Sequence, residues 1–418
     1  MNYRRLLDRA RNLPLVKETS HFRIHYGLRN SPGSRGLGCD GVRNQEIVEC
    51  YGRALERLYR MMTSPPWNRP QPVVGSSGKI DVYLLDIGHP FSTTDWQSPY
   101  IILPSSNSEV TTRLEILRAE AEAVHEATHV FNFRERPYLP SHPEWWTWFD
   151  EQRARLWACF DEGLALYLET KVYPRNLDHF RFLKDWVTSP DISLDDQVAY
   201  YHFWVFIHFL SQKFGEDFVN DVWMQSKPDE TPYQTINRLL AERPQFSELV
   251  SSSKDRLELL LSYSGDAYFL CDQASGCYLP QVHKRFSLRA ALECLSLRPG
   301  QQTTAENQID HLACQYYQIR PEPAVAKVRV ELQTNPLSPI RGEVAIVTNR
   351  LRKGDGKILQ YTDGHDSTKL VAEVKIPDHQ KIDHIILILS NCGVRGATKD
   401  PHRPHDDEQR YKLSFLAE

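Results

Sequence analysis

Apolar residues recur at three- and four-residue steps in several stretches of the N-terminal half, which is the pattern of helices with one buried face. The clearest stretch predicts a helix near 112–133, which Thr112 and Glu115 would begin as a capping box. The positions that share the apolar face of this helix are Leu114, Leu117, Ala121, Val124 and Thr128. Other helices are expected near 44–62, 155–170, 197–213, 216–226 and 232–243.

Short runs of β-branched and aromatic residues predict strands between these helices. Three of them, at 21–26, 79–86 and 100–103, precede the helix near 112–133. The strand at 100–103 would be the edge of its sheet, where unpaired backbone groups can bind an extended peptide. A plain edge strand without a ligand is an equally open interpretation.

From about residue 256 the pattern changes to an alternation of apolar and polar residues, which is typical of strands with one buried face. The apolar runs fall at 328–332, 370–376, 385–389 and 411–415. The Gly, Pro, Asp and Asn residues between them are typical of turns in an antiparallel β-sandwich. The sequence therefore predicts an α+β protein with two domains, 1–255 and 256–418.

The composition is that of an ordinary globular protein and argues against two classes of partner. Of the 418 residues, 41% are hydrophobic and 25% are charged, and no apolar run approaches the length of a membrane span. The net charge of −4 provides no basic surface of the kind that binds nucleic acid. Neither nucleic-acid binding nor a membrane span is therefore expected.

Eight cysteines and the first residues bear on the compartment. An even number of cysteines permits disulfides such as Cys39 with Cys50 or Cys271 with Cys277, and reduced buried thiols are the alternative. The residues after Met1 contain no apolar core of a signal peptide, so the chain as given is expected to carry none. These features leave the compartment open.

Residues 125–129 read His-Glu-Ala-Thr-His and fall within the helix near 112–133. Side chains four residues apart lie on one helix face, so His125 and His129 can offer two imidazoles to one cation. Glu126 would project beside that cation, where its carboxylate can act as a general base toward water. A chance occurrence of this short motif is the alternative.

A zinc site with three protein ligands and an open fourth position needs one more donor, and Glu162 on the next predicted helix can supply it. Gly163 and Ala165 beside it are small, which allows two helices to approach closely. An ordinary exposed charge on a helix is the alternative interpretation of Glu162.

These two segments resemble a known family. The HExxH motif at 125–129, followed by a Trp-x-x-x-x-Glu-Gly-x-Ala segment at 157–165, is similar to the gluzincin branch of the zincin metallopeptidases. The resemblance implies that Zn²⁺ is held by His125, His129 and Glu162. It also implies that Glu126 is the general base and proton shuttle. The metzincin pattern HExxHxxGxxH is excluded, because Asn132 and Glu135 stand where it requires glycine and histidine.

The order of strands and motifs also resembles that of secreted bacterial metalloprotease-like proteins that carry a C-terminal β-domain. The resemblance implies a zincin-like metallopeptidase domain at 1–255, followed by an antiparallel β-sandwich at 256–418. It further implies a peptide or protein substrate, favours export, and assigns the β-sandwich the accessory role of binding substrate or a surface.

Other site residues are less firmly placed by the sequence. By analogy with the Tyr or His of gluzincins, Tyr201 and His202 are candidates for stabilising the oxyanion, although core packing of their helix is the alternative.

Metal-bound histidines usually donate their second N–H to a carboxylate or carbonyl. The candidate carboxylates, each of which could instead be a solvated charge, are Glu122, Asp161 and Glu169. The tryptophan-rich segment 140–149 is either a substrate-binding lip or a hydrophobic cluster under a loop.

The sequence thus predicts a zinc metalloendopeptidase. Two other functions stay open: a non-enzymatic binding protein on a degenerate zincin scaffold, and a metal hydrolase that acts on non-peptide amides or glycans. The intact Glu126 argues against the first, because a protein that only binds has no need of a base beside the metal.

Overall fold

The computed structural model divides the chain into two compact units. The first unit comprises 1–179 and 210–235, and the second comprises 180–209 and 236–418. The structure describes residues 3–29, 40–72, 77–87, 91–95, 98–106, 112–135, 151–176, 190–194, 203–227, 229–243, 293–334, 340–348, 358–359, 369–376, 382–391 and 409–418. The boundary expected near residue 255 lies outside these ranges.

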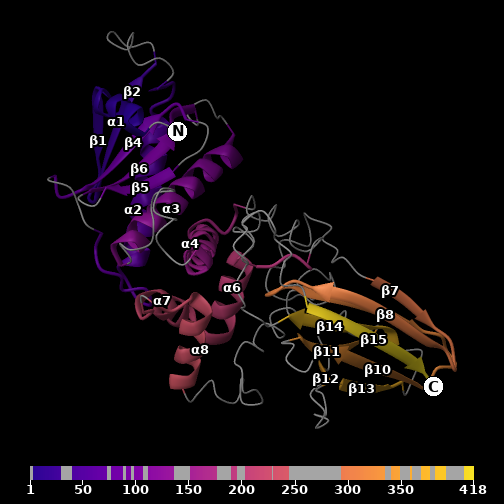
Figure 1. Ribbon diagram of the computed structural model, residues 1–418. Helices are drawn as coiled ribbons and strands as arrows, with labels where there is room; N and C mark the ends of the chain where they lie inside the picture. The colour runs from indigo at the N-terminus through magenta and orange to yellow at the C-terminus, as the bar shows by residue number, and fades with distance from the viewer. Residues whose placement is uncertain are drawn as a thin grey trace. The chain divides into compact units, whose positions relative to one another are not determined.

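The first unit contains a mixed sheet (Figure 1). Its strands are β1 (Leu15–Glu18), β2 (Phe22–Leu28), β3 (Gly41–Val42), β4 (Ile80–Leu85), β5 (Phe91–Asp95) and β6 (Ser98–Pro104). The order across the sheet is β1-β2-β4-β6-β5, with β3 paired to β2. β2, β4 and β6 are parallel, whereas β1 and β5 run antiparallel to their neighbours at the two ends of the sheet.

The prediction that 100–103 form an edge strand is wrong. β6 contains these residues and pairs on one side with β4 and on the other with β5, in a register that sets Phe91 opposite Ile102. β5 is therefore the terminal strand of the described sheet. The sequence Phe-Ser-Thr-Thr-Asp of β5 has no apolar alternation, so periodicity could not reveal it.

Five helices lie wholly within the described part of the first unit, and one of them, α3, carries the HExxH motif. They are α1 (Tyr3–Arg11), α2 (Glu46–Met62), α3 (Arg113–Glu135), α4 (Glu151–Val172) and α7 (Glu216–Met224). α2 packs against β2, and α3 packs against α2, α4, β5 and β6. α3 is thus in contact with both the sheet and α4. Most of its residues between 119 and 132 are buried.

Several predicted helices are confirmed within a few residues of their expected ends, namely those at 44–62, 112–133, 155–170, 216–226 and 232–243. The last corresponds to α8 (Pro232–Glu242), and the helix expected at 197–213 corresponds to α6 (Phe203–Phe214) where the structure describes it. α1 was not predicted. It is amphipathic over only nine residues, and its Leu6 and Ala10 pack with Leu85 and Ile102 of the sheet.

The second unit contains two β-sheets. One has the order β13-β10-β15-β8, and all its pairs are antiparallel. The other has the order β12-β11-β14-β9-β7, and among its pairs β7 with β9 is parallel. The strands are β7 (Glu293–Leu297), β8 (Gln302–Ile309), β9 (Cys314–Pro321), β10 (Lys327–Thr334), β11 (Ile340–Thr348), β12 (Ile358–Leu359), β13 (Lys369–Lys375), β14 (Ile382–Asn391) and β15 (Gln409–Ala417).

The two sheets of the second unit share one hydrophobic core. Val330 and Phe415 of the first sheet belong to the same buried cluster as Tyr317 and Ile385 of the second. The hydroxyl groups of Tyr317 and Tyr411 lie 2.6 Å apart, which joins the two sheets by a buried hydrogen bond. The α+β class expected from the sequence is confirmed, and most strand pairs of the second unit are antiparallel.

Two further expectations can be compared with the structure. Cys50, for which the sequence permitted a disulfide with Cys39, is a buried free cysteine, and Cys39 itself lies outside the described residues. Cys271 and Cys277 lie outside the described residues. Among the helices described, none combines the length and the apolarity that crossing a bilayer requires.

Candidate metal centre

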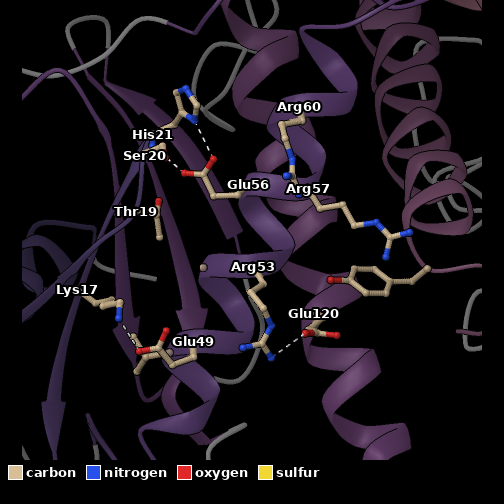
Figure 2. Close-up of a pocket in the computed structure, with 13 residues that line it drawn as sticks. Lys17, Thr19, Ser20, His21, Glu49, Arg53, Glu56, Arg57, Arg60 and Glu120 are labelled. Carbon is tan, nitrogen blue, oxygen red and sulfur yellow. Dashed lines mark hydrogen bonds and ion pairs between the residues drawn. The ribbon is translucent and has the colours of Figure 1, made fainter.

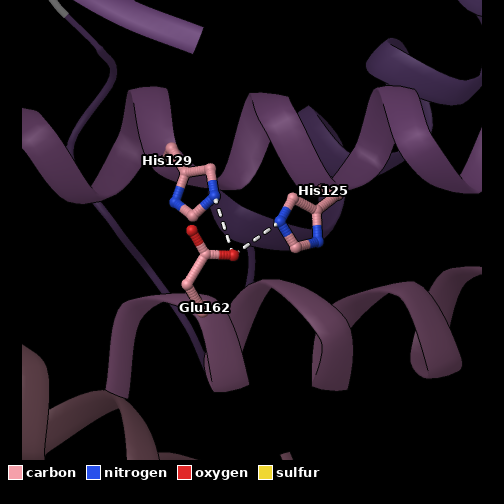
Figure 3. A group of neighbouring side chains, drawn as sticks. All are labelled: His125, His129 and Glu162. Carbon is pink, nitrogen blue, oxygen red and sulfur yellow. Dashed lines mark hydrogen bonds and ion pairs between the residues drawn. The ribbon is translucent and has the colours of Figure 1, made fainter. Parts of the chain in front are cut away.

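His125 and His129 project from one face of α3 toward α4, as Figure 3 shows. Their ring centroids lie 4.9 Å apart, as expected for imidazoles one helical turn from each other. Val124 and Val130, which neighbour them in sequence, are buried, so the helix that carries the imidazoles is held by packing on its other faces. The two rings are therefore presented from a rigid element.

Glu162 projects from α4 to meet these imidazoles (Figure 3). One of its oxygens, Oε2, lies 3.0 Å from Nε2 of His125 and 3.8 Å from Nε2 of His129. One ligand atom from each of the three residues lies within 4.8 Å of the others. Bonds of about 2 Å from a tetrahedral zinc ion would place such atoms roughly 3.3 Å apart, so only small side-chain adjustments separate this cluster from a metal site.

Two carboxylates of α4 contact the outward nitrogen atoms of the imidazoles. Oε1 of Glu169 lies 2.8 Å from Nδ1 of His125, and Oδ2 of Asp161 lies 2.9 Å from Nδ1 of His129. Of the three carboxylates that the sequence suggested for this position, the structure thus brings two to the rings. The third, Glu122, forms an ion pair with Arg118 at 3.7 Å.

The charges of the cluster shift its pKa values. Burial by itself would lower the pKa of both imidazoles, but the neighbouring carboxylates outweigh it. Hydrogen bonds with Glu162 and Glu169 raise the pKa of His125 well above its usual value. The charges of Asp161 and Glu162 raise the pKa of His129 to about 9. Burial would raise the pKa of Glu162, yet the two imidazoles lower it to about 2. The cluster therefore attracts positive charge, and a metal ion and protons would compete for it.

A buried polar network extends the site behind Asp161. Asn132, one turn beyond His129 on α3, donates a hydrogen bond to the other oxygen of Asp161 and accepts one from Arg69. Arg69 also donates to the side chain of Asn220 at 2.9 Å. Only 3% of Arg69 and none of Asn132 is exposed. Sequence reasoning missed this network, although the position of Asn132 three residues after His129 was a usable signal.

Glu126, the predicted base, is buried with 6% of its surface exposed. Burial raises the pKa of Glu169, His125 opposes that rise, and the charges of Glu122 and Glu126 add to it. The Glu126 carboxylate is therefore close enough to the cluster to act on its electrostatics. Tyr201 and His202, predicted to stabilise the oxyanion, lie outside the described residues, as does the tryptophan-rich segment 140–149.

Comparison with protein families finds one match. Residues 111–253 match the model of DUF6055, a family of unknown function. That range contains α3 and α4 and thus the whole histidine and carboxylate cluster. No curated protein matches the chain.

Comparison with solved structures finds several matches, of which two illustrate the likeness to this chain. One match is the pre-peptidase C-terminal domain of a collagenase from Bacillus anthracis, which is 10% identical with a TM-score of 0.20 over 29% of this chain and 94% of that one. Another is PliG of Aeromonas hydrophila, a periplasmic inhibitor of g-type lysozyme, which is 10% identical with a TM-score of 0.18 over 31% of this chain and all of that one. TM-scores this low support no conclusion about fold or function.

Proposed function

We propose that this chain is a zinc-dependent metallopeptidase of the gluzincin type, with a zincin-like catalytic region in its first unit. The observation that carries the proposal is the convergence of His125, His129 and Glu162, whose ligand atoms lie within 4.8 Å of one another. Two imidazoles and one carboxylate suit zinc and leave its fourth position open, as catalytic sites require.

The surrounding residues support a hydrolytic role. Zinc bound by the three ligands would polarise both a water molecule and the scissile carbonyl. Glu126, buried beside His125, takes the proton from that water and delivers it to the leaving amine. Asp161 and Glu169 hold the imidazoles through Nδ1, so that Nε2 of each ring stays directed at the ligand cluster.

The sheet supports a peptide as the substrate. β5 is the terminal strand of the described sheet and runs antiparallel to β6. α3, which carries the two histidines, packs against both strands. An extended peptide that pairs with the backbone of β5 would therefore lie along the helix that holds the ligands. The second unit would serve as an accessory domain that binds substrate or a surface.

The proposal is tested by metal content and cleavage in wild type and in Glu126→Gln. Glu122→Gln is the matched control, since Glu122 lies on the same helix and pairs with Arg118 at 3.7 Å. We expect all three proteins to bind zinc, measured by elemental analysis. We expect cleavage of a peptide library to fall about 10²- to 10⁴-fold in Glu126→Gln alone, because it removes a general base.

Three other outcomes would contradict the proposal. Full activity of Glu126→Gln would exclude the assigned mechanism. Zinc binding without cleavage of any peptide would favour a binding protein on a degenerate zincin scaffold. Zinc-dependent cleavage restricted to non-peptide amides or glycans would identify a different hydrolase.

A further inference from the structure

A pocket of about 660 Å³ lies in the first unit and is lined by none of the residues of the metal centre (Figure 2). Its walls are the β1–β2 hairpin, one face of α2, Glu120 of α3, and Tyr173, which follows the end of α4. Volumes of roughly 300–1,000 Å³ are typical of pockets that bind small molecules. Neither the sequence analysis nor the proposed peptidase activity accounts for this pocket.

Specific contacts hold the hairpin against α2. Glu56 of α2 accepts a hydrogen bond from the backbone N–H of His21 at 2.7 Å, and its other oxygen lies 2.8 Å from the imidazole of the same residue. A side chain at Gly52 would meet the methyl group of Thr19 at 3.1 Å, so glycine permits the close approach of helix and turn. The pocket is thus a defined feature of the fold.

Three carboxylates line the pocket, and each already has a partner. The pairs are Glu49 with Lys17 at 2.6 Å, Glu56 with His21 at 2.8 Å, and Glu120 with Arg53 at 3.7 Å. Burial raises the pKa of Glu120, and the charges of Arg53 and Arg57 oppose that rise. Four lysine and arginine side chains line the pocket against these three carboxylates, so positive groups outnumber negative ones; the four are Lys17, Arg53, Arg57 and Arg60.

Two of these cations, Arg57 and Arg60, lie three residues apart on α2 and have no ion pair of their own among those described (Figure 2). The guanidinium carbon of Arg57 lies 5.3 Å from the ring centroid of Tyr173, so the side chain is supported by an aromatic face. Within the described part of the chain, no carboxylate forms an ion pair with either guanidinium group. Two guanidinium groups of the pocket are thus available to a ligand.

We propose that this pocket binds a small soluble molecule that carries a phosphate group. A guanidinium group presents paired N–H donors whose geometry matches two phosphate oxygens. The excess of positive over negative groups in the lining favours a ligand with the charge of about −1.5 to −2 that a phosphomonoester carries at neutral pH. The pocket is larger than a phosphate ion alone requires, which leaves room for an organic part of the ligand beside the hairpin and α2.

The proposal is tested by calorimetric titration of the full-length chain with inorganic phosphate, in the presence of a chelator. The chelator removes any binding of phosphate to zinc, so the result does not depend on the proposed peptidase activity. The variants are Arg57→Gln and Arg60→Gln, and the matched control is Arg118→Gln, an arginine of α3 that does not line the pocket. Thermal unfolding checks that each variant is folded.

We expect saturable binding at one site in wild type and in the Arg118→Gln control. Each pocket variant should weaken it about tenfold, since each removes a charge-assisted contact. Absence of saturable binding, or an equal loss in Arg118→Gln, would overturn the proposal. Binding to vesicles that contain phosphatidic acid, without binding to inorganic phosphate, would also overturn it and would assign the arginines to a lipid headgroup.

Discussion

Asp161 holds His129 in place: its Oδ2 lies 2.9 Å from Nδ1 of that imidazole, while its other oxygen accepts a hydrogen bond from Asn132. One carboxylate of α4 thus contacts two side chains of α3. The contact fixes the ring so that Nε2 lies 3.8 Å from the Glu162 carboxylate. The second histidine is oriented by the equivalent contact with Glu169.

Asp161→Asn should weaken zinc binding. The amide keeps a polar group of the same size at Nδ1 of His129 but removes the negative charge that raises the pKa of that imidazole. Loss of such a supporting partner typically costs about 10- to 100-fold in metal affinity. Competition with a chromophoric chelator measures the change, with Glu122→Gln as control. An unchanged zinc affinity would show that the contact of Asp161 with His129 does not contribute to metal binding.

Asn132→Ala should destabilise the first unit. It removes one hydrogen-bond partner from an oxygen of the half-buried Asp161 and one from the buried guanidinium of Arg69. The expected loss is about 1–3 kcal/mol in the free energy of unfolding. Urea denaturation of wild type and variant, monitored by tryptophan fluorescence, measures it. A loss below about 0.5 kcal/mol, the ordinary range for surface substitutions, would contradict the view that the network supports the fold.

The metal-free chain should lose stability as pH rises, whereas its zinc affinity should increase. The neighbouring carboxylates raise the pKa of His129 in the folded chain to about 9, from an ordinary value near 6.5. A group whose pKa is raised on folding contributes stability that is complete below its unfolded pKa. That contribution is lost as pH rises through the folded pKa. Zinc binds the unprotonated ring, so it must displace the proton from the imidazole at any pH below the folded pKa. For each proton displaced, the affinity for zinc should rise about tenfold per pH unit until the pH reaches that pKa.

Thermal unfolding of the chelated protein between about pH 6 and pH 10 checks the first half of this prediction. Zinc titrations across the same range check the second. The His129→Gln variant is the control, because it removes one of the two titrating rings and should reduce the pH dependence of stability to the part that His125 contributes. A wild-type chain whose stability stays level across the window would contradict the predicted proton uptake.

Much of the fold follows from local pattern. The 3.6-residue period predicts α2, α3, α4, α7 and α8. The two-residue period predicts three strands of the second unit, and the continuous apolar run at 385–389 predicts a fourth. Elements without a strong pattern were not predicted: α1 is short, and β5 has a polar sequence. Both depend on contacts with the sheet, which no local pattern contains.

The sequence by itself determined that His125 and His129 share one helix face with Glu126 beside them, because a spacing of four residues sets side-chain direction within a helix. Only the tertiary structure decided that Glu162 lies 3.0 Å from His125, that Asp161 and Glu169 hold the imidazoles, and that Arg57 and Arg60 line a pocket. These relationships depend on how far one helix is shifted and rotated against the next. That shift is set by the packing of residues distant in sequence, which spacing along the chain does not encode.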